Sequence, residues 1–116
     1  MRSLYAKKPS LTSSIVDILQ TSILVLTKLK AWYASEVSED PLVHMRTRAH
    51  LIDIMVTLQW PSNEQVCIDF DGFPEAPKKE LLRLLYKLYP KNRQARPYLA
   101  ATLSWRDMRD VLCSPR

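Results

Sequence analysis

The chain has 116 residues, of which 47% are hydrophobic and 25% charged, and its formal net charge is +5. This composition is typical of one globular domain and excludes a disordered tail. Glycine occurs once, at Gly72, where average usage would give about eight. Loops that cradle phosphate need several glycines, so a P-loop and a dinucleotide-binding fingerprint are excluded.

The cysteines and the hydropathy pattern indicate where the protein is found. Cys67 and Cys113 belong to no Cys-x-x-Cys pair and form no disulfide framework, which favours a reducing compartment. The N-terminus has no apolar signal region, and the sequence has no run of ~18 apolar residues. We therefore expect an intracellular protein, cytoplasmic or nuclear, that is neither secreted nor transmembrane. A peripheral location on a membrane is the alternative.

Charge is segregated along the chain. Residues 1–10 carry Arg2, Lys7 and Lys8 without an acid, whereas residues 36–75 have a net charge of −6. Residues 78–96 have a net charge of +6. Such a chain can pair with a polyanion or with a second copy of itself. We expect nucleic acid or an anionic membrane surface as the partner, and a homo-oligomer.

The first predicted helix covers about residues 13–35. Its apolar residues recur at helical spacing but cover more than one face (Ile15, Ile18, Leu19, Ile23, Leu24, Val25, Leu26, Leu29, Trp32 and Tyr33). A helix with this pattern either forms the centre of the core or is shared with a second subunit.

The next elements are a helix and one stretch that resembles a strand. Asp40 and Pro41 predict the start of a helix that runs to about Leu58 and turns Leu42 and Met45 inward. Trp60 precedes Pro61 and should be extended. Residues 66–70 alternate apolar and polar side chains, as in a strand. Its pairing partner would be residues 55–60 or 98–103, since a lone strand is not stable.

Two further helices complete the chain. One should begin at Pro77 and end at Pro90, followed by a basic loop to residue 97. The last should run from Trp105 to Leu112 after Ser104, with Trp105, Met108 and Leu112 docked on the core.

The sequence therefore predicts a mainly α fold, a compact single domain of three to four helices over residues 11–112. The alternative is an α+β fold with a short two- or three-stranded sheet around 55–70 and 98–103. Residues 1–10 would form a basic arm and residues 113–116 a frayed tail.

The stretch PKKELLRLLYKLYPKNRQARP, residues 77–97, is the candidate binding surface. Its leucines form one apolar face (Leu81, Leu84, Leu85 and Leu88), and Lys79, Arg83 and Lys87 share another. The candidate polyanion-binding residues are Lys79, Arg83, Lys87, Lys91, Arg93 and Arg96, with Arg2, Lys7 and Lys8 as an accessory arm. Tyr86, Tyr89 and Tyr98 lie among them, and this mixture of rings and cations suits base stacking or an anionic lipid surface.

The stretch VCIDFDGF, residues 66–73, resembles the first motif of the haloacid-dehalogenase-type phosphatases. The resemblance implies Asp69 as the nucleophile and Asp71 as the general acid/base, and such a pair can also hold Mg²⁺. The match covers these residues only, and Phe73 stands where the family has a hydroxyl residue or valine. The chain that follows is too short for the rest of that fold. An acidic turn is the interpretation we favour.

We interpret the chain as a non-enzymatic binding protein with no cofactor, no metal site and no small-molecule substrate. His44 and His50 do not have the spacing of a zinc pair. The first hypothesis is electrostatic contact with RNA or another polyanion through residues 78–96. The second is a self-assembling, matrix-type structural protein of viral kind on a membrane. The third is a protein-binding accessory factor that uses exposed aromatic residues such as Trp60 or Trp105.

Overall fold

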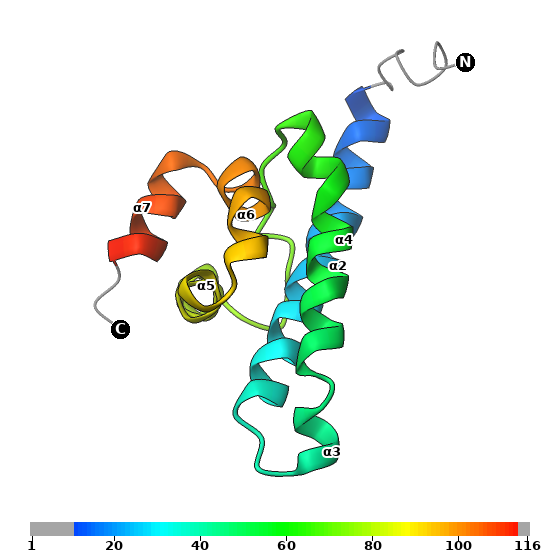
Figure 1. Cartoon of the computed structure of the whole chain (residues 1–116). Helices are drawn as coiled ribbons and strands as arrows, with labels where there is room; N and C mark the ends of the chain where they lie inside the picture. Colours follow the sequence, from blue (N-terminus) through cyan, green and yellow to red (C-terminus); the bar gives the residue numbers. More distant parts are fainter. Residues whose placement is uncertain (1–10, 114–116) are drawn as a thin grey trace.

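Two long helices, α2 (Leu11–Glu36) and α4 (Thr47–Glu64), lie side by side and antiparallel in the computed structural model (Figure 1). The structure describes residues 11–113, with side chains from 17 to 112. The remaining elements are α3 (Pro41–His44), α5 (Lys78–Lys91), a 3₁₀ turn η1 (Arg93–Ala95), α6 (Arg96–Thr102) and α7 (Trp105–Cys113). The mainly helical prediction is confirmed, and these elements form one compact globule around a single core.

Helices α2 and α4 pack against each other through their buried apolar faces. Leu26 and Leu29 of α2 and Ile54 and Leu58 of α4 are fully buried in the common core. A salt bridge of 3.0 Å between Lys28 Nζ and an oxygen of Asp53 joins the same two helices nearer the solvent. Within residues 11–113, no helix is both long enough and apolar enough to cross a bilayer.

The many apolar residues of α2 divide between core and surface. Val25 is 1% exposed and belongs to the core, whereas Ile23 is 42% exposed. Leu19 and Leu24 are also exposed. The helix is therefore central to the monomer core, while Leu19, Ile23 and Leu24 face the solvent.

The predicted helix from Pro41 to Leu58 is two helices, because α3 ends at His44 and α4 begins at Thr47. Asp40 caps α3 as predicted, and its Oδ1 accepts a hydrogen bond of 2.9 Å from the Leu42 amide. Leu42 and Met45 were both expected on the inner face, but they are 74% and 73% exposed. The reason is that α3 lies at the tip of the α2–α4 hairpin (Figure 1), where none of its residues is buried.

The prediction that Trp60 is extended is wrong, because α4 continues through Pro61 to Glu64. Pro61 lies in the last turn, where its ring disturbs the end of the helix rather than the middle. Gln65 then adopts the left-handed conformation (φ 56°, ψ 44°). The Val66 amide donates to Pro61 O at 2.9 Å and the Gln65 amide to Ser62 O at 3.2 Å. This pattern is a Schellman motif, which satisfies the last carbonyls of the helix.

The predicted sheet is not found among the described residues. The two predicted partner segments, 55–60 and 98–103, lie mainly in α4 and α6. Ile68 and Phe70 are buried, but the amides of this segment bond to other partners. The Ile68 amide donates to Thr102 O at 2.9 Å, and the Asp69 amide donates to Ser22 Oγ at 2.8 Å. The alternation thus reflects burial of every second side chain without a partner strand.

Helix α5 crosses the α2–α4 pair at a steep angle and is seen nearly end-on in Figure 1. Its predicted leucine face is confirmed, since all its members are buried (Leu81, Leu84, Leu85 and Leu88). Pro90 lies inside α5, one residue before its end. The basic loop predicted up to residue 97 is wrong, because η1 and the first turn of α6 occupy most of it.

Helix α7 begins after Ser104 as predicted, and Ser104 Oγ accepts a bond of 3.1 Å from the Asp107 amide. It ends at Cys113, one residue beyond the predicted end at Leu112. The expected docking of Trp105 and Leu112 on the core is wrong, because Trp105 is 70% exposed and Leu112 is also exposed. The inward face carries Val111 and Asp107, with Met108 partly buried against the core as predicted, and Lys78 at the start of α5 pairs with the Asp107 carboxylate.

Candidate functional site

The cations of residues 78–96 fall into two groups in the structure. Lys79, Arg83 and Lys87 lie along one side of α5, and no salt bridge involves them within the described part of the chain. Lys78, Lys91 and Arg96 bond to groups of the chain itself. Arg93 is exposed on η1, apart from both groups.

Lys78 joins α5 to α7. Its Nζ lies 3.0 Å from an oxygen of Asp107 and 5.4 Å from the ring centroid of Phe70. Because the Asp107 side chain is largely buried, removal of Lys78 would leave a carboxylate without its cation. The role of Lys78 is therefore structural.

Arg96 binds the end of α5. Its Nε donates to Tyr89 O at 3.0 Å, and its Nη2 donates to Pro90 O at 2.7 Å. The guanidinium carbon also lies 5.5 Å from the Tyr89 ring centroid. The last carbonyls of a helix lack partners within it, and Arg96 supplies them with a cation at the negative end of the dipole.

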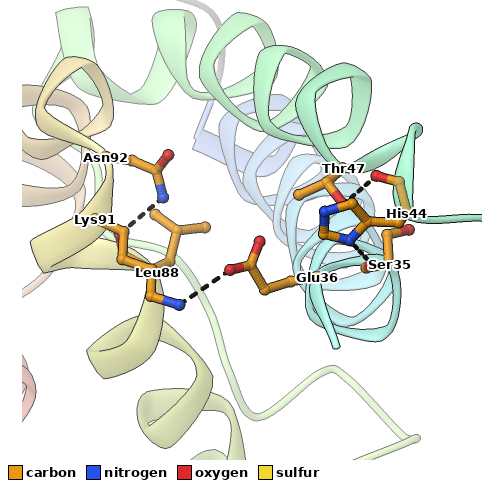
Figure 2. A network of polar contacts seen from close by, with 7 residues as sticks. All are labelled: Ser35, Glu36, His44, Thr47, Leu88, Lys91 and Asn92. Carbon is orange, nitrogen blue, oxygen red and sulfur yellow. Dashed lines mark hydrogen bonds and ion pairs between the residues drawn. The ribbon is translucent and has the colours of Figure 1, made fainter. Parts of the chain in front are cut away.

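Lys91 joins the end of α5 to the end of α2, because its Nζ donates to Glu36 Oε2 at 3.0 Å (Figure 2). In the same network the Asn92 side-chain amide donates to Leu88 O at 3.0 Å. His44 Nδ1 donates to Ser35 O at 3.1 Å, which ties the hairpin tip to α2. Thr47 Oγ1 in turn donates to the His44 carbonyl at 2.7 Å. These bonds connect the ends of α2, α3 and α5 and the start of α4, so we assign the network a structural role.

Lys79, Arg83 and Lys87 border an open groove of about 780 Å³ between α2 and α5. We call it the α2–α5 groove, and its lining is Tyr33, Pro77, Lys79, Glu80, Arg83, Leu84 and Lys87. Lys79, Arg83 and Lys87 follow one another at intervals of one helical turn, about 6 Å along the axis. Glu80 is the only acid in the lining. The groove therefore has a net positive charge and can hold an elongated anion.

Tyr33 lies at a junction in this region. It borders the α2–α5 groove and also a second hollow of about 330 Å³ lined by Trp32, Glu36, Val37, Tyr86, Lys87, Pro90 and Lys91. Lys87 Nζ lies 5.8 Å from the Tyr33 ring centroid. The ring is partly exposed, and buried Trp32 lies next to it at 6.4 Å between centroids. An aromatic ring thus stands among the cations.

Reasoning from the sequence did not select Tyr33. Its helical spacing matches the core residues of α2, and its partial burial follows that pattern. Nothing in a local pattern places α2 beside α5. Of the tyrosines selected instead, Tyr86 borders the second hollow, Tyr89 packs against Arg96, and Tyr98 of α6 borders a hollow beside α4. The accessory residues Arg2, Lys7 and Lys8 lie outside the described part of the chain.

Asp69 and Asp71 lie in a turn. Asp69 Oδ1 accepts a hydrogen bond of 3.3 Å from the Asp71 amide, the geometry of an Asx turn. A Cβ added at Gly72 would lie 2.9 Å from Asp69 Oδ2, so glycine lets the carboxylate approach the backbone. Residues 11–113 contain no cluster of three or more His, Cys, Asp or Glu side chains that could hold a metal ion.

We expect the double variant Asp69→Asn, Asp71→Asn to keep all binding activity, because an asparagine oxygen can accept the same turn bond. Binding to RNA and to vesicles, measured beside the wild type, checks this. Phosphatase activity that needs Mg²⁺ and disappears in the double variant would contradict our interpretation of the protein as non-enzymatic.

Comparisons with protein-family models, with curated proteins and with solved structures found no match to this chain.

Proposed function

We propose that this protein is a non-enzymatic binding protein whose α2–α5 groove contacts RNA or a similar polyanion without reading its sequence. The observation that carries the proposal is the arrangement of Lys79, Arg83 and Lys87. They lie along one side of a single helix, without salt bridges among the described residues, and they border an open groove. The other cations of α5 are used within the fold.

The physics of the contact is electrostatic. Lysine and arginine side chains that neutralise the phosphates of a polyanion displace its counterions into the solvent, and this release drives association at low salt. From Lys79 to Lys87 the cations span about 12 Å along the α5 axis. The basic residues Arg2, Lys7 and Lys8 would add to the net positive charge that attracts a polyanion. This binding needs neither metal nor cofactor.

One observation favours a second function, contact with an anionic membrane through α7. Trp105 is largely exposed, and the guanidinium carbons of Arg106 and Arg109 lie 6.0 and 5.1 Å from its ring centroid. An indole beside arginines suits the headgroup region of a bilayer. Loss of vesicle binding in Trp105→Ser, with RNA binding unchanged, would support this second function.

The test of the first function is the triple variant Lys79→Glu, Arg83→Glu, Lys87→Glu. We expect its affinity for RNA at low salt to fall by about tenfold or more, because attraction becomes repulsion. Among sequences the loss should be uniform, since phosphate contacts carry no sequence information. The slope of log K against log salt should become shallower by about 2, at 0.7 per lost contact on single strands. Stability should change little, because exposed cations contribute little to it.

The matched control is Arg46→Glu, Arg48→Glu, Arg106→Glu, which changes the net charge equally at exposed positions away from the groove. It should lose less affinity than the groove variant. Equal losses would mean that only total charge matters, and unchanged RNA binding by the groove variant would contradict the proposal. Sedimentation with RNA and with anionic vesicles over a salt series separates the two functions.

A further inference from the structure

We propose that the α2–α5 groove selects single-stranded RNA, with an unpaired base stacked on Tyr33 while the phosphates lie along α5. This inference rests on the proposed function and names the kind of polyanion that the site takes. Its origin is the position of one ring, which belongs to α2 but lies among cations of α5.

Tyr33 is held in the way a stacking platform requires. Part of its surface is buried, and buried Trp32 is tilted by 44° against it at 6.4 Å between centroids. The exposed part borders hollows of about 780 and 330 Å³. A ring fixed on one side and open on the other can receive a flat base, and space for that base exists beside it.

In the free protein, the Lys87 ammonium lies over the Tyr33 ring. It lies 5.8 Å from the ring centroid, and the lysine is only partly buried. A cation–π contact of this length at a partly exposed site is weak, and the lysine side chain is flexible. When a strand binds, the ammonium can move to a phosphate and leave the ring to the base. The contact with the ring is therefore given up at little cost when the polyanion arrives.

The second hollow extends the site toward the C-terminal ends of α2 and α5. Tyr86, Val37 and Pro90 give it apolar walls, and the Lys91–Glu36 pair closes its far end. A purely electrostatic surface would not need apolar walls beside its cations. Proteins that hold single strands combine a positive groove with aromatic platforms.

A duplex cannot use such a platform, because its bases are stacked on one another and present only their edges. Contact of duplex RNA with the groove is therefore limited to phosphates. Lys79, Arg83 and Lys87 serve both kinds of RNA, whereas Tyr33 serves only the single strand. This difference separates stacking from charge in an experiment.

The experiment compares wild type, Tyr33→Leu and Tyr33→Phe against oligouridine, an abasic strand of the same length and duplex RNA, by fluorescence anisotropy at fixed low salt. Leucine keeps the apolar packing and removes the ring, and phenylalanine keeps the ring. Tyr33→Leu should weaken oligouridine binding by about 5- to 100-fold, the usual range for one stacked base. It should leave the abasic strand and the duplex unchanged, and Tyr33→Phe should match the wild type throughout.

Equal weakening of oligouridine and abasic strand by Tyr33→Leu would overturn the inference, as would no weakening at all. If this variant does not fold, photocrosslinking of the wild type to 5-iodouridine RNA decides. A crosslink at Tyr33 supports stacking, and crosslinks confined to other aromatic residues overturn it. The triple variant Lys79→Glu, Arg83→Glu, Lys87→Glu tests the proposed function separately. If it bound oligouridine, the abasic strand and the duplex as tightly as the wild type does, the proposed function itself would be refuted.

Discussion

Replacement of Leu85 by aspartate is expected to unfold the protein. Leu85 is 1% exposed and lies in the centre of the buried face of α5, with Leu84 beside it. A carboxylate at this position would be far from water and would have no cation to pair with. The penalty of several kcal/mol is comparable to the whole stability of a domain, about 5–15 kcal/mol. Loss of the helical circular dichroism signal at room temperature is the result to measure, and Leu84→Asp should behave in the same way.

The matched control is Leu42→Asp in α3. This side chain is exposed at the hairpin tip, so the same chemical change should leave the melting temperature nearly unchanged. If Leu85→Asp melted like the wild type, α5 could not be packed on the core through its leucine face, and the α2–α5 groove would not exist in this form.

Replacement of Arg96 by alanine is expected to cost about 2–3 kcal/mol of folding free energy, because hydrogen bonds to charged groups contribute about 1.5–3 kcal/mol. The variant loses the bonds to Tyr89 O and Pro90 O and the contact with the Tyr89 ring. Pro90 lies beside the helix end, and without Arg96 both carbonyls would need water as a partner. Chemical denaturation measures the loss.

Two comparisons test this role of Arg96. Arg93→Ala removes the same charge at an exposed position and should leave stability nearly unchanged. Arg96→Lys should recover only part of the loss, since one ammonium cannot reproduce the planar fork of a guanidinium. Stability equal to the wild type in Arg96→Ala would return Arg96 to the group of cations free to bind a polyanion.

The sequence was informative where a local period decides the structure. Leu81, Leu84, Leu85 and Leu88 of α5 recur at helical spacing. All four are buried, because an amphipathic helix turns its apolar face to the core. At Pro61 the local rule failed. Proline usually ends a helix, but here it fits the last turn and Gln65 supplies the termination. The alternation in residues 66–70 failed for a related reason, because burial of every second side chain does not require a partner strand.

The candidate site could be predicted only in part. Helical spacing predicted that Lys79, Arg83 and Lys87 share one side of a helix. In the structure they lie on α5 and border the same groove. The sequence could not tell these cations from Lys78 and Lys91, whose acidic partners lie far away in the chain. Salt bridges of this kind depend on tertiary packing, so a count of charges overestimates the surface that is free to bind. The position of Tyr33 beside the cations of α5 likewise depends on tertiary packing.

Two hydrogen bonds join the segment between α4 and α5 to other helices, and they bear on how the fold opens. The Asp69 amide is held by Ser22 of α2, and the Ile68 amide by Thr102 at the end of α6. If either helix separated alone, an amide beside the buried side chains of Ile68 and Phe70 would lose its partner. Partial opening of one helix is thus penalised, and we expect α2, α6 and this connecting segment to lose their structure together.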